Sequence, residues 1–136
     1  MWHIRSMNTL LKLEEIALFA LFSFFFFLLS IDWWWYPILI LSPDIGMLGY
    51  LINPRVGAAT YNALHFRGTG VALFAISAPS MITGVPLEPW QEWLLAASFI
   101  ILAHASLDRA LGYGLKRNDS FQNTHLGWIG KKEPTS

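Results

Sequence analysis

The chain contains no cysteine among its 136 residues, which excludes disulfide bonds, thiolate metal sites and cysteine nucleophiles. Charged residues are also scarce, because they make up 13% of the chain against about 25% in an average soluble domain. The formal net charge is zero and lysine and arginine form no long run, so we exclude a nucleic-acid partner. A bound metal ion would need His, Asp or Glu as its ligands.

Hydrophobic residues are abundant instead, at 54% of the chain, and they gather in four long apolar segments. Such segments are typical of helices that cross a membrane. We therefore expect an all-α fold, an integral membrane four-helix bundle in contact with the lipid bilayer. The expected helices cover about residues 10–31, 33–52, 56–82 and 90–111 of a transmembrane domain over residues 1–116, and a polar cytoplasmic tail follows over residues 117–136.

Basic residues lie in every second connection between these segments. Lys12 precedes the first apolar run, Arg55 lies between the second and third segments, and Lys116 and Arg117 follow the fourth. The other two connections contain neither lysine nor arginine. By the positive-inside rule, both termini and the middle connection are expected in the cytoplasm.

Pro43 interrupts the second segment in the stretch LSPDIGMLGY. Proline suits the first turn of a helix, so we expect a new helical start here with Asp44 in its first turn. Lipid cannot satisfy the backbone groups that such a break frees. The break should therefore lie against protein or water.

Ionisable and amide side chains gather at the expected cytoplasmic end of all four helices. The set comprises Glu14, Glu15, Asp44, Asn62, His65, His104 and Asp108. Asn62 and His65 share one helix face because they are three residues apart, and His104 and Asp108 share another because they are four apart. Each ionisable group costs about 2.5–3.5 kcal/mol on entering the bilayer, so these side chains should face one another.

Two histidines and several carboxylates inside a four-helix bundle are the ligand types of a zinc, iron or manganese site. We expect Asp44, His65 and His104 to bind a divalent metal ion. Asp108 is either a fourth ligand or the carboxylate that orients His104. The metal would acidify a bound water molecule and so supply a nucleophile.

Two acidic residues of this set and the neighbouring Arg109 suit the remaining steps of a hydrolytic reaction. Asp108 or Glu14 would move protons, and Arg109 would hold an anionic head group. A purely structural network accounts for the same side chains, because Arg67 and Arg109 can pair with Asp44, Asp108 or Glu14.

Several stretches resemble a known family, the small bacterial membrane proteins grouped as domain of unknown function 4260. They are LKLEE at 11–15, PDIGMLGYL at 43–51, PRVGAATYNALH at 54–65, LAHASLDRALGYGLK at 102–116 and THLGWIG at 124–130. The resemblance covers nearly the whole chain. It implies a four-helix, multi-pass protein of the bacterial cytoplasmic (inner) membrane, and it assigns no activity.

The leading hypothesis is a membrane-embedded metal-dependent enzyme, hydrolase-like, that acts on a lipid or another amphiphile at the cytoplasmic interface. One alternative is an accessory subunit of a larger membrane complex, whose histidines bind a haem or a chlorophyll-type pigment. The other is a small proton-coupled transporter with Glu14 as the acidic residue. It would work as a homodimer, because four helices alone make a thin pore.

Overall fold

The structure, a computed structural model, describes residues 2–130 of the chain, and its side chains from residue 8 onward. The elements are α1 (Trp2–Phe27), α2 (Trp35–Leu39), the 3-10 helix η1 (Ser42–Leu51), α3 (Pro54–His65), α4 (Arg67–Thr83), α5 (Pro89–Leu111), β1 (Asn123–Thr124) and β2 (Gly127–Trp128). The fold is mostly helical, as the sequence predicts. A short antiparallel hairpin of β1 and β2 is added to it. The end of the expected tail, residues 131–136, lies outside the described residues.

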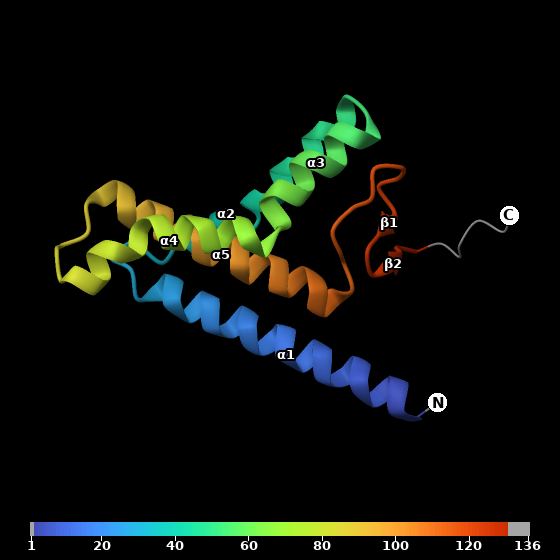
Figure 1. Cartoon of the computed structure of the whole chain (residues 1–136), viewed down its shortest axis with the longest axis horizontal. Coiled ribbons are helices and arrows are strands. Elements are labelled where there is room, and N and C mark those ends of the chain that lie inside the picture. Colours follow the sequence, from blue (N-terminus) through green and yellow to red (C-terminus); the bar gives the residue numbers. More distant parts are fainter. Residues whose placement is uncertain (1, 131–136) are drawn as a thin grey trace, which may run out of the picture.

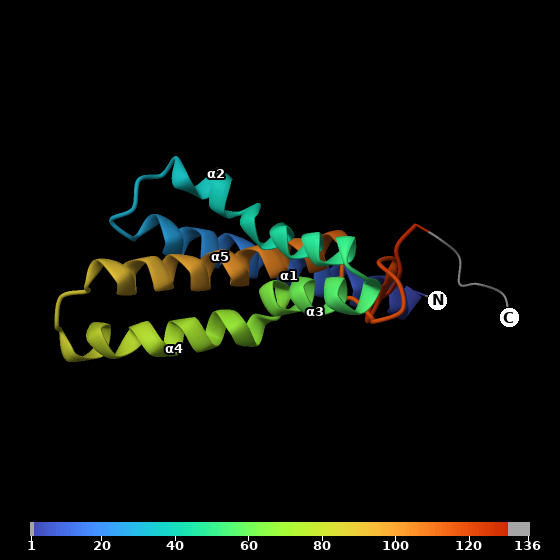
Figure 2. The same ribbon diagram turned by 90° about the horizontal axis from the view of Figure 1, so that it is seen from above.

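Helix α5 is the centre of the molecule. Helices α1 and α4 lie along it and run in the opposite direction, as Figures 1 and 2 show. The buried apolar cluster joins Phe26 of α1 to Leu95, Ala96, Phe99 and Ile100 of α5. Burial of each large side chain of this kind stabilises a fold by about 1.5–3 kcal/mol, so this cluster fixes α1 against α5.

Small residues let α4 approach α5 closely. The Ser98 hydroxyl donates a hydrogen bond to the Gly70 carbonyl at 2.8 Å. A Cβ atom at Gly70 would lie 2.7 Å from Cγ of Leu102, which is closer than real contacts allow. The backbones of the two helices are therefore nearer than any larger residue at position 70 would permit.

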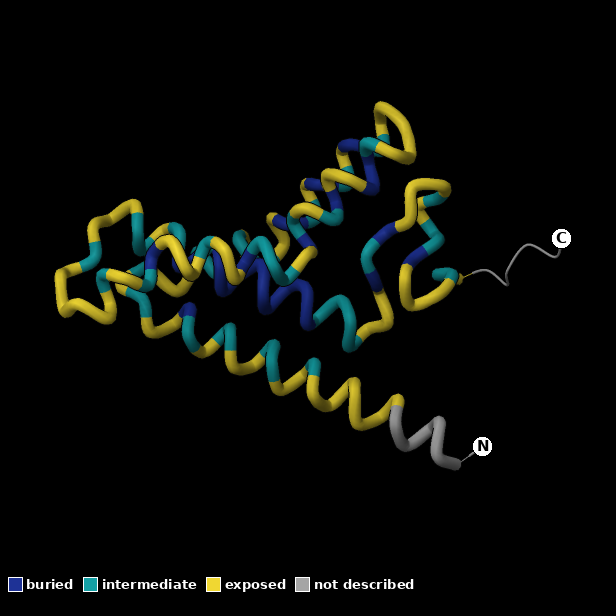
Figure 3. Tube along the Cα trace, in the orientation of Figure 1, coloured by how far each residue is buried: buried dark blue, intermediate teal, exposed yellow. Residues whose placement is uncertain are grey.

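Large apolar residues of α1 and α4 are exposed, and Figure 3 shows exposed residues in yellow along both helices. These large apolar residues are Leu10, Leu11, Leu13, Ile16, Leu21, Phe24 and Phe27 on α1, and Val71, Phe74, Ile76, Met81 and Ile82 on α4. Among the described residues, α5 is the helix that is long and apolar enough to cross a membrane, judged by length and composition. The arrangement with four membrane spans stays a prediction.

Two of the expected helices are interrupted in the structure. The second is divided between α2 and η1, where Pro43 predicts a break. The third, expected as one helix over residues 56–82, is divided at Phe66, whose backbone is extended (φ −80°, ψ 119°). The Thr69 hydroxyl donates to the Ala63 carbonyl at 2.7 Å and so satisfies a group that the break frees. No proline marks this position, so hydrophobicity alone predicts a continuous helix.

The chain turns back after α5. Gly112 adopts a left-handed conformation (φ 92°) that favours glycine, and it ends the helix. The Asn62 amide then holds the returning segment at both backbone groups of Lys116, donating to its carbonyl at 2.8 Å and accepting from its N–H at 2.7 Å. The segment after α5 is thereby attached to α3.

Candidate metal centre

Three parts of the chain meet at the C-terminal half of α5. This helix contributes His104 and Asp108, the last residue of α3 contributes His65, and the first turn of η1 contributes Asp44. The Nε2 atoms of the two imidazoles are 3.0 Å apart. The Oδ1 atom of Asp44 lies 3.4 Å from each of them. One donor atom of each of these three residues therefore points to a common position.

Asp108 is the fourth member of the group. Its Oδ2 atom is 3.4 Å from Nε2 of His65, and its Oδ1 atom is 3.7 Å from Nε2 of His104. Both histidines are only 3% exposed, whereas the Asp108 and Asp44 side chains are 17% and 39% exposed. The four residues that the sequence predicts as ligands are thus neighbours, and they are reached by solvent from the carboxylate side.

The outer nitrogen of each imidazole faces a backbone carbonyl. Nδ1 of His65 is 2.9 Å from the Tyr61 oxygen, and Nδ1 of His104 is 2.6 Å from the Ile40 oxygen. A carbonyl only accepts hydrogen bonds, so each Nδ1 carries a proton. The Nε2 atom of a neutral imidazole then has a lone pair and no hydrogen. Two such lone pairs 3.0 Å apart repel each other unless a proton or a metal cation lies between them.

The break in the second segment supplies one of these carbonyls. Ile40 lies between α2 and η1, where the regular pattern of helical hydrogen bonds stops. The freed carbonyl is therefore available to orient the His104 ring. A carbonyl partner of this kind is common behind metal-binding histidines.

Glycine brings η1 close enough to α3 for Asp44 to reach the cluster. A Cβ atom at Gly46 would lie 2.8 Å from the Thr60 carbonyl oxygen. The Thr60 hydroxyl also donates to the Gly46 carbonyl at 2.6 Å. The position of the Asp44 carboxylate thus depends on an uninterrupted contact between the two backbones.

The spacing of the donor atoms suits a small divalent metal ion. Metal–ligand bonds of about 2.0–2.2 Å in a tetrahedron separate the ligand atoms by about 3.3–3.6 Å. The Asp44 Oδ1 atom is 3.4 Å from each Nε2 atom, within this range, and the two Nε2 atoms, 3.0 Å apart, are slightly closer than it. Two imidazoles with one or two carboxylates suit zinc, iron or manganese.

Tyr61 is a part of this site that sequence reasoning missed. Its hydroxyl donates to Oδ2 of Asp108 at 2.7 Å. Its ring stacks on the His65 ring, with centroids 3.6 Å apart and an interplanar angle of 14°. The sequence does contain a signal for Tyr61, because Tyr61 and His65 are four residues apart and so share one helix face. Asn62, expected to accompany His65, instead binds the backbone of Lys116.

The other predicted residues lie outside the cluster of donor atoms. Glu14 is exposed on α1. Arg67 pairs with Glu15 and donates to the Ser106 hydroxyl at 3.0 Å, so it does not neutralise the two aspartates. Arg109 borders a cavity of about 10 Å³ beside Asp108, which has no room for an anionic head group.

A larger cavity of about 330 Å³ opens beside the two aspartates. It is lined by Asp44, Met47, Tyr61, Asp108, Tyr113, Lys116, Phe121 and Ile129. Lys116 is only 5% exposed, and its Nζ atom lies 5.1 Å from the Tyr61 ring centroid and 4.1 Å from that of Phe121. Burial lowers the pKa of the Lys116 ammonium, while the charges of Asp108 and Asp44 act in the opposite direction.

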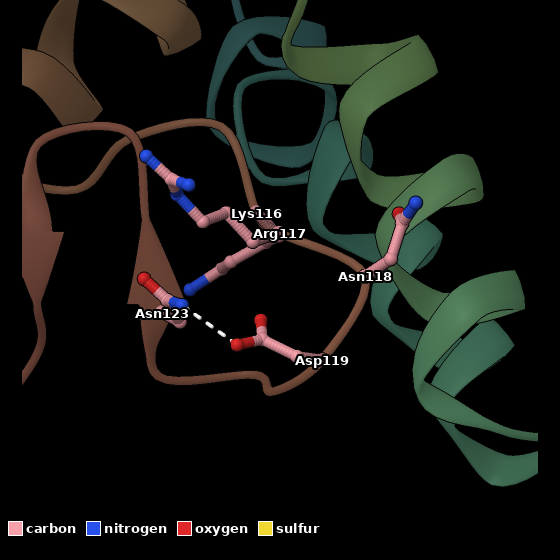
Figure 4. Close-up of a pocket in the computed structure, with 5 residues that line it drawn as sticks. All are labelled: Lys116, Arg117, Asn118, Asp119 and Asn123. Atoms are coloured by element: carbon pink, nitrogen blue, oxygen red, sulfur yellow. Dashed lines mark hydrogen bonds between the residues drawn. The ribbon is translucent and has the colours of Figure 1, made fainter. Parts of the chain in front are cut away.

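A second hollow, of about 440 Å³, lies in the loop before the hairpin (Figure 4). Its lining residues include one carboxylate and no histidine. That carboxylate, Asp119, accepts a hydrogen bond from the Asn123 amide at 2.8 Å, which lowers its pKa. The loop hollow therefore lacks the donors of a metal site, and its one acid has a structural partner.

The comparisons agree with the resemblance seen in the sequence. Residues 8–129 match the family described as Domain of unknown function (DUF4260), and the chain belongs to this family. No curated protein and no solved structure matches the chain.

Proposed function

We propose that this member of the DUF4260 family is a metal-dependent hydrolase of the bacterial inner membrane. A zinc, iron or manganese ion would be bound by Asp44, His65 and His104, with Asp108 as a fourth ligand or beside them. The substrate would be a lipid or another amphiphile at the cytoplasmic interface. The observation that supports this most strongly is the pair of Nε2 atoms 3.0 Å apart, whose outer nitrogens both face carbonyls.

The distribution of side chains supports a membrane location with several spans. Exposed apolar residues on α1 and α4 would face water at a high cost in a soluble protein. The connections over residues 28–34 and 84–88 contain no lysine or arginine, and five tryptophans lie within or near them, at positions 33, 34, 35, 90 and 93. Tryptophan favours a membrane interface. The proposed metal site is at the opposite end of the bundle, which the positive-inside rule assigns to the cytoplasm.

The residues around the proposed ion have distinct roles in hydrolysis. A divalent ion lowers the pKa of a bound water molecule and makes it a nucleophile near neutral pH. The two imidazoles would hold the ion through Nε2, and their carbonyl partners keep them in the required tautomer. The Asp108 carboxylate would take the proton from the water, and the Tyr61 hydroxyl fixes its orientation.

The first test is the metal content of the detergent-purified protein, prepared without chelator and measured by mass spectrometry. We expect nearly one zinc, iron or manganese ion per chain in the wild type. The variants His65→Ala and His104→Ala should lose it, because each removes one donor atom. His125→Ala is the matched control, since His125 is exposed and its Nδ1 accepts from the Leu115 N–H.

An empty wild-type protein would refute the metal-dependent enzyme. The space between the two Nε2 atoms would then hold a proton, shared between the imidazoles and stabilised by the carboxylates. That result would favour the proton-coupled transporter. Proton-driven flux in liposomes, lost in His104→Ala, would distinguish it from the accessory subunit.

A further inference from the structure

We infer that the cavity beside Asp44 and Asp108 binds the singly charged phosphate of a phosphodiester, and that Lys116 is the residue that holds it. This inference deepens the proposed function and rests on a divalent ion at the proposed centre. It assigns the role of anion ligand, expected of Arg109, to Lys116, because Lys116 lines this cavity whereas the cavity that Arg109 borders beside Asp108 measures about 10 Å³.

Lys116 is held in place without its charge being paired. Its backbone is fixed by both groups of the Asn62 amide, and its Nζ atom lies over the rings of Tyr61 and Phe121. Among the described residues, its ammonium forms no ion pair within 4.0 Å. A nearly buried cation of this kind is costly unless it meets an anion. Lys116 lines both this cavity and the loop hollow, and of the two this cavity is the one beside the proposed metal centre.

The charges around the cavity define the anion. The Asp44 and Asp108 carboxylates contribute two negative charges, and a divalent ion would balance them. The Lys116 ammonium then leaves one positive charge facing the cavity. A substrate with one negative charge would neutralise it, whereas a neutral ester would leave the ammonium uncompensated.

A phosphodiester combines this single charge with a bond that water can cleave at the charged group itself. A carboxylate also has one charge but has no such bond. In the proposed reaction the water oxygen forms a bond to phosphorus, and the ester P–O bond to one alcohol breaks. The proton lost by the water passes through Asp108 to the departing oxygen, so the products are a phosphomonoester and an alcohol.

The size and walls of the cavity fit a head group. Its volume of about 330 Å³ is at the lower end of the range of small-molecule sites, which is roughly 300–1,000 Å³. It accommodates a phosphodiester with small substituents. Met47, Phe121 and Ile129 form apolar parts of its wall, so an attached acyl chain would leave over an apolar surface.

The test measures zinc content and phosphodiester binding separately in the full-length, zinc-loaded protein. The probe is diethyl phosphate, which resists hydrolysis, and its dissociation constant is measured by titration calorimetry. We expect Lys116→Met to retain zinc and to bind the probe at least about tenfold more weakly, as is typical for loss of a charged hydrogen bond. Arg117→Met is the matched control for a neighbouring charge. Lys116→Arg keeps the positive charge and should bind the probe as the wild type does. It is the second variant of the test if Lys116→Met folds poorly.

The outcomes separate the two proposals. Zinc retained with equal probe binding in wild type and Lys116→Met would overturn the role of Lys116 and leave the metal centre intact. Zinc retained with no probe binding in the wild type would overturn the phosphodiester site. A wild type without metal would overturn both. Dihexanoyl phosphatidylglycerol and its deacylated head group then identify the source: tighter binding of the former indicates a lipid, and equal binding indicates a soluble phosphodiester.

Discussion

Tyr61→Phe gives the sharpest test of the proposed centre, because it removes one hydroxyl and keeps the ring that stacks on His65. The hydroxyl donates to Oδ2 of Asp108 at 2.7 Å. If Asp108 is a metal ligand or lies beside the ligands, this hydrogen bond fixes the position of its carboxylate. Its loss should therefore weaken metal binding while leaving the imidazoles and the helix packing in place.

The size of the effect follows from the charge on the acceptor. A hydrogen bond to a charged group contributes about 1.5–3 kcal/mol, and about 1.4 kcal/mol corresponds to a factor of ten in affinity. We therefore expect zinc affinity to fall by about 10- to 100-fold, which agrees with the usual effect of removing a group behind a metal ligand. Competition with a chromogenic zinc chelator measures this directly.

Tyr50→Phe is the matched control, because it deletes the same atom from a different place. The Tyr50 hydroxyl is buried and has no hydrogen-bond partner among the residues that the structure describes. Its removal should leave zinc affinity unchanged and should not lower stability, since an unpaired buried hydroxyl is unfavourable. Equal zinc affinity in wild type and Tyr61→Phe would refute the participation of Asp108. An equal loss in both variants would show that the effect is a general disturbance of the fold.

Three further predictions concern topology, stability and packing. Because the chain has no native cysteine, single-cysteine variants report location cleanly: an impermeant maleimide should label Glu88→Cys in intact cells, and Asn118→Cys only after permeabilisation. Burial lowers the pKa of Lys116 in the folded protein below its ordinary 10.5. The ammonium charge therefore destabilises the fold at every pH below this lowered pKa, and the effect disappears above pH 10.5, where Lys116 is neutral in both the folded and the unfolded chain. Lys116→Met should therefore melt higher than wild type at neutral pH, by a margin that shrinks towards pH 10.5. Gly46→Ala should reduce metal content, because its Cβ would lie 2.8 Å from the Thr60 carbonyl oxygen.

The sequence predicts the position of the cluster better than the course of the chain around it. His104 and Asp108 are placed on one face by helical spacing alone, and Pro43 predicts the break that positions Asp44. The break at Phe66 was not predicted, because it carries no proline and the hydrogen bond that accompanies it, from the Thr69 hydroxyl to the Ala63 carbonyl, leaves no mark in the hydrophobic pattern.

Lys116 could not be placed by periodicity. It follows the last helix and reaches the cavity only because the chain reverses at Gly112 and is held by Asn62. Asn62 itself was expected beside His65, since both lie on α3 with a favourable spacing. Local spacing therefore identifies which residues share a helix face, whereas contacts across a reversal require the tertiary fold.

The extended backbone at Phe66 also affects how α3 is connected to the rest of the molecule. Together with the break around Ile40, it leaves α3 and η1 as a packed pair that projects from the three long helices (Figure 1). Asp44 and His65 belong to this projecting pair, while His104 and Asp108 belong to α5. An ion bound by all four residues would therefore cross-link the α3–η1 pair to α5. Binding or release of the ion would then change how strongly this pair is held against the three long helices.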